Sequence, residues 1–142
     1  MEFTINRDIF LKTLSYANGI IEKKTTLPIL SNILIEAKGS KIKIIATDLD
    51  IIYFEEILPN DVKREGSTTT SAGVLYDILR KLQPDAKIEL SLQSTNKLKI
   101  VFFGNIIGSI LILGSISRLL EESLWLSVAT PHKNDLFSNF IL

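Results

Sequence analysis

The sequence predicts an α+β domain in which two helices pack on antiparallel β-sheet. Short segments of alternating polarity occur in runs, and only two segments repeat their apolar residues at helical spacing. Polar turns separate successive strand segments. The resulting order is a strand, a helix, four strands, a second helix and two strands, which argues against a doubly wound parallel sheet. We expect both helices to cover one face of the sheet.

The first strand and the first helix follow each other directly. Phe3 and Ile5 alternate with Glu2 and Thr4, which is the period of a half-buried strand. Asn6 can cap the helix that begins after it. The apolar residues that recur on one side of this helix are Phe10, Leu14, Ala17 and Ile21.

The middle of the chain predicts a β-hairpin and two further strands. Residues 33–37 and 41–45 alternate on either side of a Lys-Gly-Ser turn, which is typical of a hairpin. Residues 51–57 and 68–70 are predicted strands because β-branched and aromatic residues dominate them. Residues 58–66 contain proline, asparagine, aspartate and glycine, so we expect a loop there.

The second helix begins at a serine cap and is followed by a hairpin. Ser71 precedes a segment whose apolar residues again recur at helical spacing, and Pro84 ends it. Residues 88–92 and 97–100 alternate around a polar turn and predict two antiparallel strands. The buried side of the helix is predicted to consist of Val74, Leu75, Ile78, Leu79 and Leu82.

Composition narrows the possible functions. The 142 residues suit one domain, and 16 basic residues balance 16 acidic ones. Any contact with nucleic acid must therefore come from local placement of charge. The absence of cysteine excludes disulfides and thiolate chemistry, and the N-terminus lacks the features of a secretory signal. We expect a cytoplasmic protein.

The sequence offers no recognisable catalytic or metal-binding pattern. His132 is the only histidine, and no serine and acidic partners lie at a spacing that suggests a triad. Asp48 and Asp50 lie two apart, but the apolar residues around them favour the start of a strand over a metal site. The carboxylates of Glu55 and Glu56 should point to opposite faces of a strand and cannot readily share a proton. We therefore expect neither an enzyme nor a cofactor.

Three segments of the sequence carry recognisable motifs. Residues 25–35 read Thr-Thr-Leu-Pro-Ile-Leu-Ser-Asn-Ile-Leu-Ile and resemble the TLPILxNxLL signature of bacterial β sliding clamps, the DNA polymerase III subunit beta family. Residues 46–50 resemble its TDLE/D element, and residues 74–82 resemble its second helix. The three lie in the family's order, and the resemblance covers residues 1 to about 101.

This resemblance implies the DNA-clamp fold, in which helices line a central channel and antiparallel sheets form the outer rim. Clamp subunits carry three such domains, and two subunits close a ring around duplex DNA. The ring slides because it encloses the duplex, so the resemblance implies a non-catalytic processivity subunit of a DNA polymerase. Such a protein would take part in DNA replication.

The resemblance also implies which residues face DNA. Sliding requires contacts that do not read sequence, and Lys or Arg side chains bound to phosphates meet that need. Lys24 is the first candidate because it stands in the loop where clamps place a DNA-contacting basic residue, and Lys23 lies beside it. Arg80, Lys81 and then Lys12 are further candidates, with ordinary solvated surface charge as the alternative for each.

The sequence departs from the family at two places. Gly73 stands where the family often has a basic residue facing DNA, so we expect weaker DNA affinity. After Val101 the family-like sequence stops, and residues 100–117 carry no charge. We expect a clamp domain over residues 1–118 and a divergent tail over residues 119–142.

The uncharged segment leaves several interpretations open. It can be an edge strand, or a membrane segment flanked by Lys99 and Arg118. The whole chain can be a truncated clamp whose reading frame slipped near codon 102. In that case ring closure with a second subunit is doubtful, and the pocket for polymerase and clamp-loader peptides is absent. A membrane-associated or protein-interaction module that has lost DNA binding is the alternative function.

Overall fold

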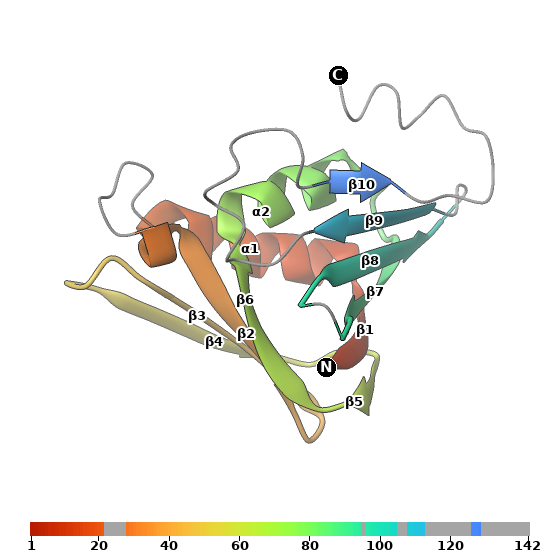
Figure 1. Cartoon of the computed structure of the whole chain (residues 1–142), viewed down its shortest axis with the longest axis horizontal. Coiled ribbons are helices and arrows are strands. Elements are labelled where there is room, and N and C mark those ends of the chain that lie inside the picture. Colours follow the sequence, from red (N-terminus) through yellow and green to blue (C-terminus); the bar gives the residue numbers. More distant parts are fainter. Residues whose placement is uncertain (22–27, 95, 105–107, 113–125, 129–142) are drawn as a thin grey trace.

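The computed structural model describes residues 1–21, 28–94, 96–104, 108–112 and 126–128. Within these residues, two α-helices and ten strands form a helical layer and two antiparallel sheets (Figure 1). The α+β class and the pairing of two helices with antiparallel sheet are as predicted.

The larger sheet contains the first strand of the chain. β1 pairs antiparallel with β5 on one side and with β7 on the other. The order across the sheet is β10-β9-β8-β7-β1-β5. Its strands are β1 (Glu2–Asn6), β5 (Asp61–Arg64), β7 (Lys87–Leu92), β8 (Leu98–Phe103), β9 (Gly108–Ile112) and β10 (Leu126–Val128).

The smaller sheet contains the predicted central hairpin. Its order is β4-β3-β2-β6, and all of its pairings are antiparallel. A single turn of 3-10 helix, Pro28–Ser31, leads into it. Its strands are β2 (Asn32–Lys38), β3 (Lys41–Thr47), β4 (Ile52–Ile57) and β6 (Gly66–Ser71).

Both helices begin at the predicted caps. Before α1 (Arg7–Ile20), the Asn6 side chain accepts hydrogen bonds of 2.8 and 3.4 Å from two backbone N–H groups of the first turn. Before α2 (Ala72–Lys81), the Ser71 hydroxyl accepts one of 3.4 Å from the backbone N–H of Val74. These bonds satisfy N–H groups that have no partner within a helix.

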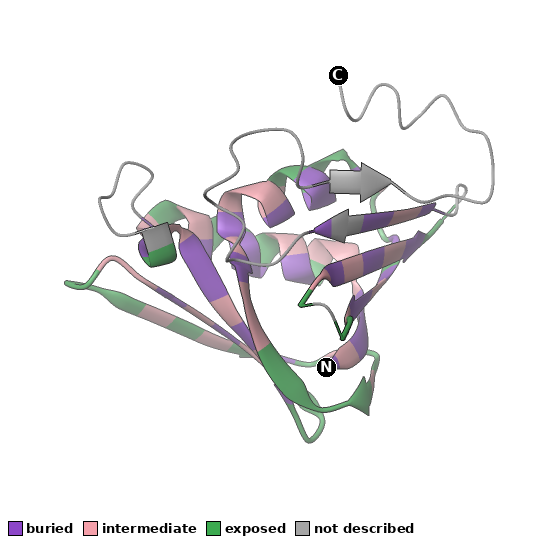
Figure 2. Ribbon diagram, viewed as in Figure 1, coloured by how far each residue is buried: buried purple, intermediate pink, exposed green. Residues whose placement is uncertain are grey.

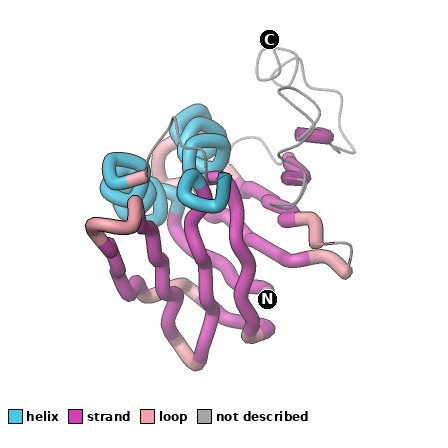
Figure 3. Tube along the Cα trace, turned by 60° about the vertical axis from the view of Figure 1, so that its left-hand side comes forward, coloured by secondary structure: helices cyan, strands magenta, loops and turns pink. Residues whose placement is uncertain are grey.

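The helices cover two sheets rather than one, which corrects the predicted single sheet face. α1 packs on β1 of the larger sheet and on β3 and β4 of the smaller one, and α2 packs on β2 and β6. In Figure 3 the helices lie together on one side of the strands. Strand alternation shows which residues face a core but does not show into how many sheets the strands separate, and this explains the error.

The core lies between the helical layer and the sheets, where Figure 2 shows the buried residues. Phe3 of β1 and Phe10 of α1 meet edge to face there, with ring centroids 6.2 Å apart and planes at 84°. Ile33 and Ile35 of β2 and Leu75 of α2 are fully buried in the same cluster. The apolar residues of the strands and of both helices thus pack into one core.

β5 corrects the prediction of a loop over residues 58–66. Its four residues, Asp-Val-Lys-Arg, expose their charged side chains and leave only Val62 partly buried, so the apolar signal of a strand is weak. Ion pairs compensate for the small apolar burial of this strand. The Lys63 ammonium lies 2.6 Å from the Glu89 carboxylate and 3.5 Å from that of Glu2. Short charged strands of this kind are common at sheet edges.

The uncharged segment after Lys99 forms strands where the structure describes it. β8 and β9 pair antiparallel, with Ile100 opposite Ile110. Searched over the described residues, the chain has no helix with the length and apolar character that crossing a membrane requires. The edge-strand interpretation therefore holds for residues 108–112. Most of the predicted tail, residues 119–142, lies outside the residues that the structure describes.

Candidate functional site

The exposed faces of α1 and α2 form the surface on which the sequence places most of its candidate residues. The two helices pack against each other, and the contacts at their ends show that they run antiparallel. Arg7, at the start of α1, hydrogen-bonds to Leu79 and Arg80 at the end of α2. At the opposite ends, a Cβ atom added at Gly73 would lie 3.8 Å from the Asn18 amide oxygen.

The end of α2 is fixed by Arg7, which was not among the residues predicted from the sequence. The Arg7 Nε donates to the Leu79 carbonyl at 2.8 Å, and one terminal nitrogen donates to the Arg80 carbonyl at 3.0 Å. Because these carbonyls belong to the last turn of a helix, they have no hydrogen-bond partner within the helix. The C-terminal end of the helix also carries partial negative charge, which attracts the guanidinium. The Arg7 side chain is only 11% exposed, so its charge is committed to this contact.

Asp8 completes the same junction. Its carboxylate accepts from the other terminal nitrogen of Arg7 at 2.5 Å and from the backbone N–H of Asp85 at 2.9 Å. The hydrogen bond from Arg7, followed by that from Asp85, holds the pKa of the Asp8 carboxyl below its usual value. The start of α1 thereby holds both the end of α2 and the turn before β7.

Arg7 could have been found from the sequence. A basic residue in the first turn of a helix lies at the positive end of the helix dipole, which is unfavourable unless another group compensates. Its position directly after the Asn6 cap therefore indicated a partner elsewhere in the fold.

Three of the five predicted site residues lie on the described helices, and all three are exposed. Lys12 lies on α1, and Arg80 and Lys81 lie in the last turn of α2. Arg80 has local partners, since its guanidinium is 3.5 Å from the Asp77 carboxylate and 5.8 Å from the centroid of the Tyr76 ring. Cations in the last turn also stabilise the helix through its dipole, so the surface-charge interpretation of both residues has a physical basis.

Lys23 and Lys24 lie outside the described residues, as does His132. In the chain the two lysines follow α1, whose described end lies beside Gly73.

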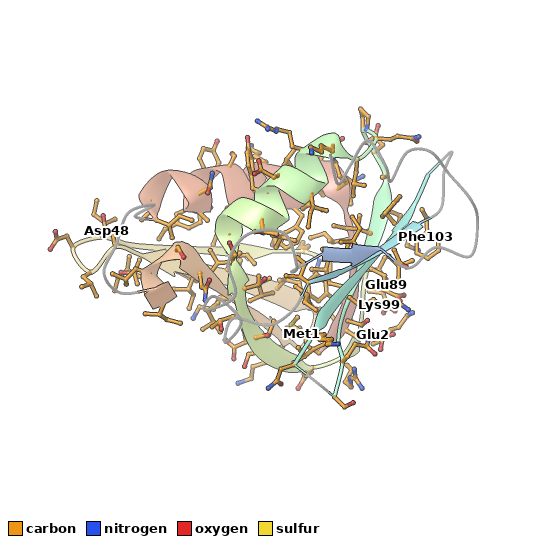
Figure 4. All side chains as sticks on the ribbon, turned by 45° about the horizontal axis from the view of Figure 1, so that its top comes forward. Met1, Glu2, Asp48, Glu89, Lys99 and Phe103 are labelled. Carbon is orange, nitrogen blue, oxygen red and sulfur yellow. The ribbon has the colours of Figure 1, made fainter. Side chains whose placement is uncertain are left out.

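Asp48 and Asp50 belong to a turn, not to the start of a strand as predicted. β3 continues to Thr47, and Leu49 has a φ of 86°. The Asp48 carboxylate accepts from the backbone N–H groups of Asp50 at 3.0 Å and Ile51 at 2.7 Å. This carboxylate serves to close the turn, at the end of the molecule labelled in Figure 4.

The remaining carboxylates on β4 have separate partners. Tyr53 donates its hydroxyl hydrogen bond to Glu55, while Glu56 forms an ion pair of 2.7 Å with Lys41. Burial, together with the carboxylate of Glu55, raises the pKa of the Tyr53 hydroxyl well above its usual value. Within the part of the chain that the structure describes, no three acidic or histidine side chains gather as a metal site would require.

Comparison with known proteins gives one consistent family. Residues 1–120 match the model of the DNA polymerase III beta subunit, N-terminal domain. The beta sliding clamp of Caulobacter vibrioides is 40% identical over 91 residues, which are 64% of this chain and 24% of that protein. The clamp of Pseudomonas aeruginosa is 33% identical over 93 residues, covering 66% and 25%. The chain thus spans about a quarter of the length of these curated relatives.

Solved structures agree with the sequence comparison. A sliding clamp (DNA polymerase III subunit beta) of Bartonella birtlesii, bound to griselimycin, has a TM-score of 0.74 at 33% identity. The match covers 87% of this chain and 32% of that one. Caulobacter crescentus pol III beta has a TM-score of 0.70 at 35% identity, covering 77% and 29%.

Proposed function

We propose, since this chain belongs to the family of DNA polymerase III beta subunit N-terminal domains, that it contributes one non-catalytic domain to a ring holding duplex DNA. The observation that carries the proposal is the arrangement of α1 and α2. They pack side by side in front of two sheets, and Lys12, Arg80 and Lys81 are exposed on them. In this proposal the helical layer faces the duplex and the sheets form the outside of the ring.

The contacts we propose are with phosphates. Lys and Arg attract phosphate over several ångströms without regard to base sequence, so a protein held in this way can slide. The pair between Arg80 and Asp77 does not prevent such a contact, because both side chains are more than half exposed and exposed pairs are weak. Lys24, with Lys23 beside it, is the strongest candidate by resemblance to the family.

A ring needs more domains than this chain supplies. The chain spans about a quarter of its curated relatives, so in our proposal a second clamp subunit or further clamp domains complete the enclosure. Contacts with polymerase and clamp loader would then lie on those parts. A truncated form acting by itself would bind DNA weakly and would leave it readily, because nothing encloses the duplex.

Salt dependence of DNA binding tests the proposal. Fluorescence anisotropy would measure the affinity of the whole chain for two duplexes of unrelated sequence over a series of salt concentrations. We expect Lys12→Ala, Lys24→Ala and Arg80→Ala each to weaken binding equally for both duplexes. Each should reduce the slope of log affinity against log salt by about 1.

Lys38→Ala is the matched control for this experiment. Lys38 is an exposed lysine at the hairpin end of β2, so its replacement changes the net charge equally but removes no charge from the helices. If it lowers the slope as much as Lys24→Ala does, the positive groups act only through total charge and the proposed surface is wrong. A wild-type chain with no salt-dependent affinity would favour a protein-interaction module instead.

A further inference from the structure

A hollow lined by charged side chains lies on the face of the smaller sheet that points away from the helices. Its volume is about 250 Å³. It is lined by Glu36, Lys38, Lys41, Lys43 and Glu56. These residues alternate along their strands with core residues such as Ile35, Ala37 and Ile42, so their side chains leave the sheet on the opposite side. The hollow is therefore separate from the exposed faces of α1 and α2.

Two lysines face each other at the end of the β2–β3 hairpin. Lys38 lies directly opposite Lys41, and like charges in this position repel each other. The ammonium of Lys41 lies 2.7 Å from the Glu56 carboxylate, but among the residues that the structure describes Lys38 has no such partner. The Glu65 carboxylate at the same turn accepts from the Gly39 backbone N–H at 2.7 Å. A negative group placed between the two lysines would relieve their repulsion.

The next row of the hollow alternates in charge. Lys43 lies opposite Glu36 on one side and opposite Glu56 on the other, and its ammonium is 4.9 Å from the centre of the Phe54 ring. The hydrogen bond and charge of Lys41, followed by the charge of Lys43, hold the pKa of the Glu56 carboxyl below its usual value. Within the described ranges, Glu36 forms no ion pair. The Glu36 carboxylate can therefore accept a positive group from a ligand.

The size and the mixed charge of the hollow favour a protein ligand. Pockets for small molecules and cofactors are lined mainly by apolar side chains and enclose roughly 300–1,000 Å³, whereas this hollow is smaller and charged. The phosphates of a nucleic acid would meet the carboxylates of Glu36 and Glu56, which repel them. A protein segment can instead offer one side chain of each sign. On an extended segment, side chains two positions apart lie roughly 7 Å from each other, as Glu36 and Lys38 do along β2.

We propose that this hollow binds an extended segment of a partner protein that carries an acidic residue and, two positions away, a basic residue. The acidic side chain would lie between Lys38 and Lys41, and the basic side chain would contact Glu36. The proposal does not depend on the proposed DNA contacts, because the hollow and the helices lie on opposite sides of the smaller sheet. The side chains of Lys41 and Glu56 are 57% and 42% exposed, and exposed ion pairs are weak. We therefore expect a transient contact, with a dissociation constant on the order of 1 mM for a short peptide.

Nuclear magnetic resonance of the isotope-labelled full chain tests the proposal with three synthetic peptides, each capped at both ends. Ser-Asp-Ser-Lys-Ser carries the two charges at the required spacing. Ser-Asp-Ser-Asp-Ser and Ser-Lys-Ser-Lys-Ser carry charges of one sign only. The first peptide should shift the backbone amide signals of β2 and β3 in a saturable way. The other two should bind at least about fivefold more weakly, because each meets a like charge in one row of the hollow.

Charge reversal at Lys38 gives the matching protein variant. Lys38→Glu should raise the dissociation constant of Ser-Asp-Ser-Lys-Ser about tenfold, because it replaces an attraction to the acidic residue with a repulsion. Lys87→Glu is the matched control, since Lys87 is an exposed lysine at the start of β7 in the larger sheet, and it should leave the binding unchanged. The dispersion of the amide signals would establish that both variants fold.

Three results would overturn the proposal. The first is equal binding of the three peptides, and the second is an equal loss of binding in Lys38→Glu and Lys87→Glu. The third is a duplex DNA that shifts the same amide signals of β2 and β3, because the hollow would then bind nucleic acid instead of a protein segment.

Discussion

Arg7 connects the two helices at their ends through its guanidinium. It donates to two carbonyls of α2 and to the carboxylate of its neighbour Asp8, which in turn accepts from the loop before β7. Arg80 lies in the turn of α2 that Arg7 holds, so the junction fixes the backbone from which the Arg80 side chain extends. A single side chain thus couples the stability of the fold to the geometry of the proposed DNA-facing surface.

Replacing Arg7 should therefore destabilise the protein more than replacing an exposed cation. Arg7→Ala leaves two helix carbonyls without their side-chain donor and leaves the Asp8 carboxylate with only the Asp85 N–H, and we expect the free energy of unfolding to fall by about 2 kcal/mol. Arg7→Lys should recover only part of this loss, because an ammonium cannot reproduce the planar fork of donors. Urea denaturation monitored by circular dichroism measures both variants.

Lys12→Ala provides the comparison for Arg7, since Lys12 is exposed on α1. Its effect on the free energy of unfolding should stay within about 0.5 kcal/mol. Equal effects at the two positions would mean that the Arg7 hydrogen bonds contribute nothing net to stability.

Among the elements, those with strong periodicity were predictable and those held by charge were not. Both helices, their caps Asn6 and Ser71, and the β2–β3 hairpin follow from apolar spacing and turn residues. β5 could not be predicted from periodicity, because only Val62 is partly buried and the charged Lys63 finds its partners on β1 and β7, which are remote in sequence. For the candidate site, Lys12, Arg80 and Lys81 were predictable as exposed helical cations. Arg7 acts through tertiary contacts, which the periodicity of a helix face does not reveal.

Gly73 offers a gain-of-function test at the level of the helix. It lies near the start of α2, and a Cβ atom there meets nothing closer than the Asn18 side chain at 3.8 Å, so a side chain fits. Gly73→Arg gains about 0.5–1 kcal/mol of helix propensity, but its cation lies in the first turn of α2, at the positive end of the helix dipole, and this offsets part of the gain. The same substitution should also tighten binding to duplex DNA and steepen the salt slope by about 1, because it adds a cation to the helical surface.

Gly73→Ala separates the two effects of that substitution. It should stabilise the protein by at least as much as Gly73→Arg, measured by urea denaturation, because it adds helix propensity without a charge, and it should leave the salt dependence measured by anisotropy unchanged. If Gly73→Arg binds DNA no better than Gly73→Ala, the start of α2 does not face the duplex.

In the molecule as a whole, one helical layer serves two sheets, and the chain passes from one sheet to the other at Gly66. β5 belongs to the larger sheet and β6 to the smaller, and Glu65 alone separates them before Gly66 begins β6. The backbone of Met1, which precedes β1, lies against this point. The start of the larger sheet's first strand thus lies against the point where the chain enters the smaller sheet.

Gly66→Ala should disturb that junction more than a comparable substitution elsewhere. Gly66 has a φ of +146°, which L side chains rarely adopt, and an added Cβ atom would lie 3.0 Å from the Met1 nitrogen. We expect the free energy of unfolding to fall by about 2 kcal/mol. Gly39→Ala, at a φ of +59° with nothing within 4 Å, carries backbone strain without the contact and should lose only about 1 kcal/mol. Urea denaturation of the two variants would decide, since equal losses would mean that the approach of Met1 to Gly66 does not hold the sheets together.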